Sequence, residues 1–357
     1  MKWFVSGLAL LLVAGMLAST LASRPPFDES LDVATLADLP LAPVDQALTF
    51  ARTREQGRLR ILLVTRYQSG TVTGVDLNRH LHTDTPDPVK LFREAGYDAL
   101  AAAATAAEVV TVSTDALDVP FDAHEQNIGI GANYREHARE SGIDEQPFVF
   151  PKLAQPTPFN SAVARGDSVL LDYEAELGLV ALDDIVANDT ALPRFGLVLC
   201  NELTDRWTLV RHLRRDTEMG TSGFAEGKSR DGFASIGSLL VIPRDLESFY
   251  KKLELRLYLN GRLRQQETPA NMVWGPAAIR SEIFRRADWT FHHYDKTLPL
   301  LDAGQKITAG TIIFSGTPAG VIFKPHNLWN PWAYLRPGDE VVIRSPTLGV
   351  IRNAITR

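Results

Sequence analysis

Cysteine is almost absent from the 357-residue sequence, because Cys200 stands alone and can form neither an intramolecular disulfide nor a paired-cysteine zinc site. Positive charge is not in excess either. The 37 lysines and arginines face 43 aspartates and glutamates, and the net charge of −6 argues against nucleic acid as a partner. No internal repeat is present. The remaining composition, with 45% hydrophobic and 22% charged residues, is typical of a globular chain of one or two domains.

Residues 1–23 differ from the rest of the chain. A basic start at Lys2 precedes an apolar run from Trp3 to about Leu17, followed by small residues up to Ser23. This pattern indicates a secretory signal peptide. The stretch from Trp3 to Ala22, about twenty residues, would also suffice as an uncleaved membrane anchor. Both interpretations export the rest of the chain to the periplasm or cell envelope, with the membrane involved only through this segment.

The hydrophobic pattern of the remaining chain changes near Pro120. Residues 24–120 predict a small α+β N-terminal domain, with a helix near 44–56, strands at 58–65 and 70–77, and helices at 88–97 and 99–108. Residues 121–357 predict a larger, mostly antiparallel β domain, so the expected fold class is α+β. Asn260-Gly261, which follows an alternating stretch, predicts a hairpin turn. The expected strands of this part are 169–171, 173–182, 196–200, 238–242, 253–259, 311–315 and 340–343, and its helices are 206–215, 276–286 and a short one near Tyr134.

An alternating acidic stretch is the first candidate for chemistry. In a strand, Asp172, Glu174 and Glu176 lie on one face, and the residues between them point to the other. The segment continues as 178–182, which is apolar on both faces and indicates burial. Adjacent buried carboxylates need raised pKa values or a cation, and oxygen ligands suit Mg²⁺ or a related hard ion. The alternative is an exposed, solvated strand face without a function of its own.

A histidine and a glutamate form the second candidate. His137 and Glu140 lie three residues apart, so a helix would bring them within reach of each other. A carboxylate that orients an imidazole makes a general base able to activate water. Because Ser141-Gly142 follows at once, the helix would be short and lid-like. The alternative is an exposed histidine in an ordinary helix salt bridge.

Together these segments resemble the fumarylacetoacetate hydrolase family. The resemblance covers roughly residues 58–357, weakly before Asn127 and well after it, and implies a β-rich fumarylacetoacetase-like C-terminal domain (a mixed β-sandwich roll) and a homodimer. Its members cleave a C–C bond in 1,3-dicarbonyls such as acylpyruvates, or decarboxylate, hydrate or tautomerise related oxo-acids. The matching pieces follow the family's order: 128–134 with His137 and Glu140, 147–152, 172–177, Asn201-Glu202 with Arg206, 227–233, 314–321 and 335–339.

The resemblance also implies a site, with a divalent metal ion (Mg²⁺, Mn²⁺ or Ca²⁺) that chelates the substrate's dioxygen unit. It further implies that a water activated by the histidine attacks the carbonyl, while a lysine offsets the charge of the departing enolate. The implied residues are the metal ligands Glu174, Glu176 and Glu202, the catalytic residues His137, Glu140 and Lys228, and the substrate contacts Tyr134, Arg206, Gly316 and Thr317.

The expected function is therefore a metal-dependent hydrolase that cleaves a C–C bond of an acylpyruvate-like oxo-acid. One alternative is a decarboxylase, hydratase or tautomerase on the same scaffold. Another is an exported binding module without catalytic activity.

The sequence departs from the family pattern in several places. Glu202 stands where the hydrolases usually have Asp, which keeps the charge, and Leu209 stands where they often have a Gln that helps to hold the substrate. Gly237-Ser238 replaces the usual Gly-Pro. Two extra segments, 213–224 and 285–301, are expected to shape the mouth of the pocket.

Overall fold

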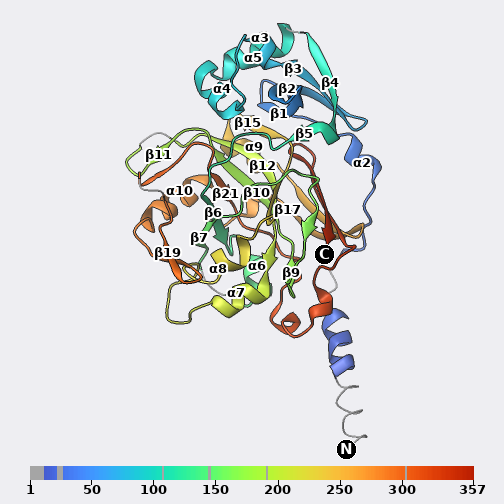
Figure 1. Cartoon of the computed structure of the whole chain (residues 1–357), viewed down its shortest axis with the longest axis vertical. Helices are drawn as coiled ribbons and strands as arrows, with labels where there is room; N and C mark the ends of the chain where they lie inside the picture. The colour runs from blue at the N-terminus through green and yellow to red at the C-terminus, as the bar shows by residue number, and fades with distance from the viewer. Residues whose placement is uncertain (1–11, 22–26, 107, 144–145, 190–191, 302–303) are drawn as a thin grey trace, which may run out of the picture.

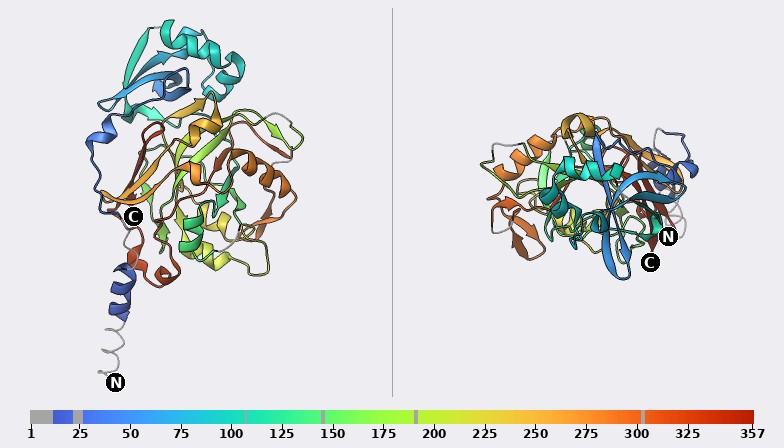
Figure 2. Two further views of the ribbon diagram at one scale, coloured as in Figure 1. Left: turned by 180° about the vertical axis from the view of Figure 1, so that it is seen from behind. Right: turned by 90° about the horizontal axis from the view of Figure 1, so that it is seen from above.

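The computed structural model describes residues 12–21, 27–106, 108–143, 146–189, 192–301 and 304–357. A small part formed mainly by residues 47–120 stands at one end of a larger, strand-rich part (Figure 1). The helical residues 12–21 lie at the opposite end of the molecule (Figures 1 and 2). This arrangement confirms the predicted α+β fold class.

The small part contains a sheet with helices beside it. The predicted strands at 58–65 and 70–77 and the predicted helices at 88–97 and 99–108 are all present. The elements are the strands β1 (Ala47–Glu55), β2 (Arg58–Gln68), β3 (Thr71–Asp76), β4 (Val109–Ser113) and β5 (Leu117–Asp118), and the helices α2 (Ala34–Ala37), α3 (Leu77–His80), α4 (Pro88–Ala95) and α5 (Tyr97–Ala106).

The helix expected near 44–56 is wrong, because Ala47–Glu55 form strand β1. This strand pairs with β2 along one edge and with β15 (Leu240–Pro243) along the other. The first seven of its residues are buried. A strand that is covered on both faces has no alternation of apolar and polar residues, so its apolar run cannot be told from that of a helix.

A long mixed sheet runs through both parts of the molecule. Its twelve strands follow the order β4-β3-β2-β1-β15-β12-β10-β21-β6-β7, with β14 beside β12 and β5 beside β1. All neighbours are antiparallel except β21 and β6. The strands not yet given are β6 (Asn127–Gly131), β7 (Phe148–Lys152), β10 (Ala175–Ala181), β12 (Phe195–Glu202), β14 (Ala234–Ile236) and β21 (Ile312–Phe314).

A second, five-stranded sheet packs against the first. Its order is β17-β16-β22-β23-β8, and strands β16, β22 and β23 contact β10 and β12 of the long sheet. The predicted turn at Asn260-Gly261 is confirmed, since it joins the antiparallel pair β16 and β17. The bounds are β8 (Val163–Ala164), β16 (Leu255–Leu259), β17 (Arg262–Glu267), β22 (Glu340–Ser345) and β23 (Gly349–Thr356).

Short helices and two-stranded pairs surround these sheets. Strands β10 and β12 are buried along their whole length, which is why residues 177–181 of β10 and 195–200 of β12 are apolar without alternation. The helices are α6 (Arg135–Glu140), α7 (Arg206–His212), α8 (Phe224–Lys228), α9 (Leu246–Tyr250) and α10 (Pro276–Arg285), and the pairs are β9 (Leu171–Asp172) with β13 (Thr204–Asp205), β11 (Ile185–Val186) with β20 (Lys306–Ile307), and β18 (Phe291–His293) with β19 (Lys296–Leu298).

The segment 1–23, expected to be a signal peptide or membrane anchor, lies partly outside the described residues. Its helical residues 12–21 contact the loop around Asn327, where the Ser19 hydroxyl donates a hydrogen bond of 2.5 Å to the Asn327 side chain. Among the helices in the described ranges, none is both long and apolar enough to span a membrane.

Candidate active site

Three carboxylates meet where strands β10 and β12 lie side by side. In this antiparallel pair Ala175 is opposite Asn201, so Glu174, Glu176 and Glu202 all fall at the same end of the two strands. Their exposed fractions are 3%, 1% and 1%, and each offers a ligand atom within 4.8 Å of the others. The burial rules out the exposed strand face that the sequence had left open.

Three basic side chains surround this carboxylate group. The Lys228 ammonium donates hydrogen bonds of 2.7 Å to both Glu174 and Glu202. The Arg206 guanidinium forms ion pairs with Glu174 at 2.5 Å and with Asp172 at 2.9 Å. From strand β7, the fully buried Lys152 ammonium lies 3.4 Å from Glu202. Four carboxylates thus share three cations, which leaves one negative charge uncompensated when all of these groups are ionised.

The surrounding charges split the pKa values of these groups. Burial raises the pKa of Glu174, but the charges of Lys228 and Arg206 outweigh it and hold that pKa below its ordinary range. Burial lowers the pKa of Lys228, yet Glu174 and Glu202 more than compensate and raise it. No described lysine or arginine forms an ion pair with Glu176, so burial and the charges of Glu202 and Glu174 raise its pKa well above the ordinary value.

Two oxygens of this group fit a metal ion. Among the residues that the structure describes, no donor forms a hydrogen bond with the buried Oε1 of Glu176, and the buried Oε1 of Glu202 has only the Lys152 ammonium at 3.4 Å. Buried carboxylate oxygens without donors cost free energy unless a cation meets them. Because every candidate ligand atom is a carboxylate oxygen, the site suits a hard divalent ion such as Mg²⁺, Mn²⁺ or Ca²⁺.

The predicted pair of His137 and Glu140 lies on the short helix α6. The His137 Nδ1 atom is 3.2 Å from Glu140 Oε1. The same carboxylate accepts a hydrogen bond of 2.9 Å from the backbone N–H of Gly320 and forms an ion pair with the Lys324 ammonium at 2.9 Å. Burial raises the pKa of Glu140, but His137 and Lys324 outweigh it and the net shift is downward. Glu140 therefore both orients the imidazole and fastens α6 to the loop after Thr317.

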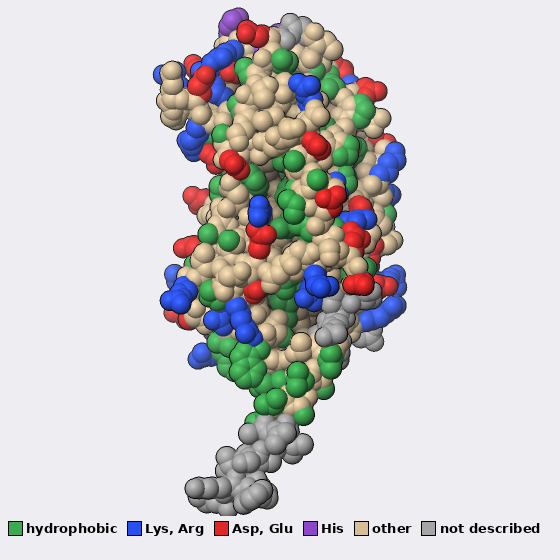
Figure 3. Space-filling view, turned by 90° about the vertical axis from the view of Figure 1, so that its right-hand side faces the viewer, with side chains coloured by type: hydrophobic (Ala, Val, Ile, Leu, Met, Phe, Trp, Pro, Cys, Tyr) green, Lys and Arg blue, Asp and Glu red, His purple; other side chains and the backbone are tan. Residues whose placement is uncertain are grey.

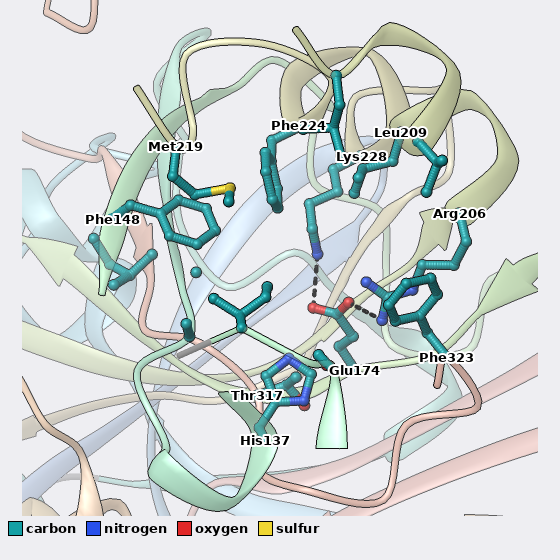
Figure 4. A pocket seen from close by; sticks show the side chains of 17 residues that line it. His137, Phe148, Glu174, Arg206, Leu209, Met219, Phe224, Lys228, Thr317 and Phe323 are labelled. Atoms are coloured by element: carbon teal, nitrogen blue, oxygen red, sulfur yellow. Dashed lines mark hydrogen bonds and ion pairs between the residues drawn. The ribbon is translucent and has the colours of Figure 1, made fainter. Parts of the chain in front are cut away.

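One cavity of about 180 Å³ is lined both by Glu174 of the carboxylate group and by His137 of the histidine–glutamate pair. Glu174, Arg206, Lys228, His137 and Thr317 all line it. In Figure 4, Glu174 lies at the centre with hydrogen bonds or ion pairs to Lys228 and Arg206, and the His137 ring lies nearby beside Thr317. Apart from Ser141, the remaining wall is mostly apolar and is formed largely by Phe148, Leu209, Val210, Leu213, Met219 and Phe224.

Two of the predicted substrate contacts lie outside this lining. Tyr134 is buried and does not line the cavity, and burial, with the charge of Glu176, raises the pKa of its hydroxyl. The Gly316 N–H donates to Glu176 at 2.9 Å, so it supports a candidate metal ligand. The Thr317 hydroxyl lines the cavity while it donates to the Ala175 carbonyl at 3.2 Å.

Two lysines near the site had no role in the sequence-based prediction. Lys152 ends strand β7 and donates to the backbone carbonyls of Lys228 and Phe233. The sequence did offer a signal for Lys152. It follows four apolar residues, and a lysine in such a stretch is rarely buried without a partner. For Lys324 we find no signal, since the chain must fold before it meets Glu140.

The two extra segments contribute differently. From 213–224, Leu213, Met219 and Phe224 line the cavity. The segment 285–301 supplies no lining residue in the described part of the chain, but strand β18 supports the first segment, because the His292 N–H donates to the Thr221 carbonyl at 2.8 Å. The expectation that both shape the pocket holds directly for the first segment and indirectly for the second.

Comparisons with known proteins agree on one family. A family model described as fumarylacetoacetate (FAA) hydrolase C-terminal matches residues 126–356. Oxaloacetate tautomerase YisK of Bacillus subtilis is 29% identical over 251 residues, which cover 67% of this chain and 72% of that protein. The mitochondrial oxaloacetate tautomerase FAHD2B of Bos taurus is 28% identical over 306 residues, or 81% and 86% of the two chains. A 2,4-didehydro-3-deoxy-L-rhamnonate hydrolase of a Sphingomonas species is 28% identical over 247 residues, or 67% and 75%.

Solved structures share the fold. A fumarylacetoacetate hydrolase from the psychrophilic Exiguobacterium antarcticum aligns with a TM-score of 0.61 and 22% identity over 87% of this chain and 99% of its own. A 2-hydroxyhepta-2,4-diene-1,7-dioate isomerase from Mycobacterium marinum aligns with a TM-score of 0.58 and 17% identity over 87% and 98%.

Proposed function

Because the chain belongs to the fumarylacetoacetate hydrolase family, we propose that it is a metal-dependent hydrolase that cleaves a C–C bond of an acylpyruvate-like 1,3-dicarbonyl acid. The observation that carries this proposal is the single cavity onto which Glu174, Lys228 and His137 all open. A candidate metal ligand, a cation and an imidazole are the groups that hydrolysis of such a bond requires.

Glu174, Glu176 and Glu202 would hold the divalent ion. When bound, it would act as a Lewis acid on the dicarbonyl unit of the substrate. The raised pKa of Glu176 and its buried Oε1 atom without a hydrogen bond support this assignment, because a nearby cation would favour the ionised carboxylate.

His137 would take the proton from the attacking water. With Nδ1 engaged by Glu140, the other ring nitrogen, Nε2, is the one that can accept it. A bond forms between the water oxygen and the acyl carbonyl carbon, and the bond from that carbon to the central methylene breaks. The electron pair of the broken bond passes to the pyruvate part as an enolate, whose carbon then receives the proton that His137 took from the water. The products are a carboxylic acid and pyruvate, and one water is consumed.

Lys228 and Arg206 supply positive charge at the same end of the cavity. Lys228 is held between Glu174 and Glu202, so its ammonium is fixed before the substrate binds. It would offset the negative charge that develops on the enolate. Arg206, which also lines the cavity, would orient the carboxylate of the substrate.

The experiment is to incubate the purified protein with Mg²⁺ and a 2,4-dioxo acid and to identify the products. We expect equimolar carboxylic acid and pyruvate, and a kcat for His137→Ala lower by about 10²- to 10⁴-fold, as is usual for loss of a general base. Metal affinity should not change in this variant, because His137 is not among the candidate ligands. An unchanged rate for His137→Ala would contradict the water-activating role.

A tautomerase is the second candidate, because relatives in the same family are named oxaloacetate tautomerases. His137 would then move a proton between carbon and oxygen of the substrate, and no water would be consumed. In the same assay this activity would change the enol absorbance without releasing pyruvate from a 2,4-dioxo acid.

We also propose that the protein is exported to the cell envelope. Besides the composition of residues 1–23, support comes from apolar side chains gathered at one end of the molecule, part of which Figure 3 shows beside the residues drawn in grey. Leu12, Leu17, Trp329 and Trp332 are exposed there, and tryptophan is enriched where proteins meet membrane surfaces.

The homodimer also stays a prediction, which light scattering after size-exclusion chromatography tests.

A further inference from the structure

The cavity has two chemically different ends. Glu174, Arg206 and Lys228 lie together at one end (Figure 4). Away from them, Met219, Phe148 and Phe224 lie close to one another, and the rings of Phe148 and Phe224 meet edge to face with centroids 4.6 Å apart. A substrate whose dicarbonyl unit occupies the polar end therefore extends its other end along an apolar wall.

The apolar wall is separate from the core of the protein. Phe148, Leu209 and Phe224 belong to a small hydrophobic cluster of their own, with Val210 and Met219 packed against it. An apolar wall that faces a cavity with a few convergent polar groups is typical of a ligand site.

Two glycines fix this wall in place. Gly220 (φ +90°) lies so close to strand β7 that a Cβ atom would come within 2.3 Å of the Val149 carbonyl oxygen. Gly223 (φ +79°) lies equally close to α7, where a Cβ atom would come within 2.5 Å of the Leu209 carbonyl oxygen. Only glycine tolerates both the conformation and the contact, so Met219 and Phe224 are held against the cavity.

The apolar end offers no partner to a second carboxylate. Of the described residues that line the cavity, the only lysine and arginine are Lys228 and Arg206, and both are paired with Glu174. A carboxylate that loses its water without a cation or donors is strongly disfavoured. At the position where family hydrolases often have a polar glutamine, Leu209 adds a further apolar contact.

We infer that the substrate is an acylpyruvate whose acyl group is short, uncharged and apolar, either a short alkyl chain or a single aromatic ring. This inference rests on the proposed function for the position of the dicarbonyl end. The size limit follows from the volume of about 180 Å³, which lies below the range of about 300–1,000 Å³ common for larger ligands. Dicarboxylic acids such as oxaloacetate and fumarylpyruvate are excluded as preferred substrates.

Binding of uncleavable 2-oxo acids to the Mn²⁺-loaded protein tests the apolar end independently of catalysis. 2-Oxohexanoate and 2-oxoadipate differ only in a terminal methyl against a terminal carboxylate, and 2-oxobutyrate lacks two methylenes. By calorimetry we expect 2-oxohexanoate to bind more tightly than either of the others by about tenfold or more, since each buried methylene adds roughly fourfold. Equal affinities, or no binding of 2-oxohexanoate, would overturn the inference.

A matched pair of variants locates the selectivity. Met219→Lys places a cation in the apolar wall and should favour 2-oxoadipate over 2-oxohexanoate. Val169→Lys adds the same charge at an exposed position outside the cavity and should leave the wild-type ranking unchanged. If both variants rank the ligands alike, the wall described here does not select the substrate.

Turnover separates this inference from the proposed function. With Mg²⁺ bound, wild-type protein should hydrolyse 2,4-dioxooctanoate with a higher kcat/KM than fumarylpyruvate. Faster hydrolysis of fumarylpyruvate would refute the apolar-substrate inference while supporting the hydrolase. The expected binding order without hydrolysis of any acid would refute the hydrolase and leave the selectivity of the cavity supported.

Discussion

Replacing Glu140 by glutamine should lower kcat by about 10- to 100-fold, because the change removes the negative charge beside His137 and keeps the shape of the side chain. Glutamine retains a carbonyl oxygen that can still accept from the imidazole and from the Gly320 N–H. The variant therefore removes chiefly the electrostatic stabilisation of the imidazolium that forms when His137 takes a proton.

The magnitude follows from the geometry. The two side chains are 10% and 14% exposed, and opposite charges about 4 Å apart at an effective dielectric of about 20 interact with roughly 4 kcal/mol. Lys324, at 2.9 Å from the other carboxylate oxygen, cancels part of this interaction. A remainder of about 1.5–3 kcal/mol corresponds to the 10- to 100-fold loss.

Lys324→Met is the matched variant. It removes the other ion pair of Glu140 but leaves the carboxylate beside His137, so kcat should fall by less than about fivefold. Because Lys324 is one of the groups that lower the pKa of Glu140, its loss should raise that pKa. The acid side of the kcat profile should then move to higher pH than in the wild type.

The assay is kcat against pH on 2,4-dioxooctanoate at saturating Mg²⁺, with Mg²⁺ affinity measured separately for each variant. Equal losses in Glu140→Gln and Lys324→Met at neutral pH would mean that Glu140 acts by fastening helix α6 rather than by its charge. An undiminished rate for Glu140→Gln would refute the argument altogether.

Three further predictions concern the metal, the core of the site and the N-terminus. Glu176→Ala should weaken Mn²⁺ binding by more than about 100-fold in calorimetry with an unchanged melting temperature, and a wild-type protein that binds neither Mg²⁺ nor Mn²⁺ would refute the metal site. Lys152→Met should lower the free energy of unfolding by about 3–5 kcal/mol in urea titrations, because it leaves Glu202 buried without that cation; an unchanged midpoint would contradict this. Cell fractionation should find the protein in the envelope. There, mass spectrometry that finds a chain starting at Ser23 indicates cleavage, and an intact Met1 indicates an anchor. A soluble cytoplasmic species would contradict both.

Much of the fold could be predicted because the local sequence patterns of strands and turns agree with the way the strands pair in the folded chain. Strands β2 and β3 alternate or end at turns, and the Asn260-Gly261 turn has the backbone that a tight hairpin requires. Strand β1 was mistaken for a helix although it pairs with the neighbouring β2, because its other partner, β15, lies almost 200 residues later in the chain. A pattern that depends on such a distant partner leaves no mark in the local sequence.

The acidic residues of the site could be predicted for a different reason. Glu174 and Glu176 are unusual beside an apolar stretch, and His137 and Glu140 have helical spacing, so each pair stands out locally. Glu202 came from the resemblance, and the register of β10 against β12 gives the physical reason that it joins them. A charged residue beside an apolar stretch can thus be recognised in the sequence even when the residue that it contacts cannot.

The apolar wall of the cavity shows where this signal ends. Phe148, Leu209 and Met219 look in the sequence like residues of any hydrophobic core, and nothing local separates a side chain that fills a core from one that lines a cavity. The distinction depends on whether other side chains pack against the residue, and only the folded chain determines this. In this protein the glycines at 220 and 223 hold the loop where its apolar side chains leave space between them. If the cavity selects its substrate as inferred above, these two backbone positions contribute to that selection without carrying a reactive group.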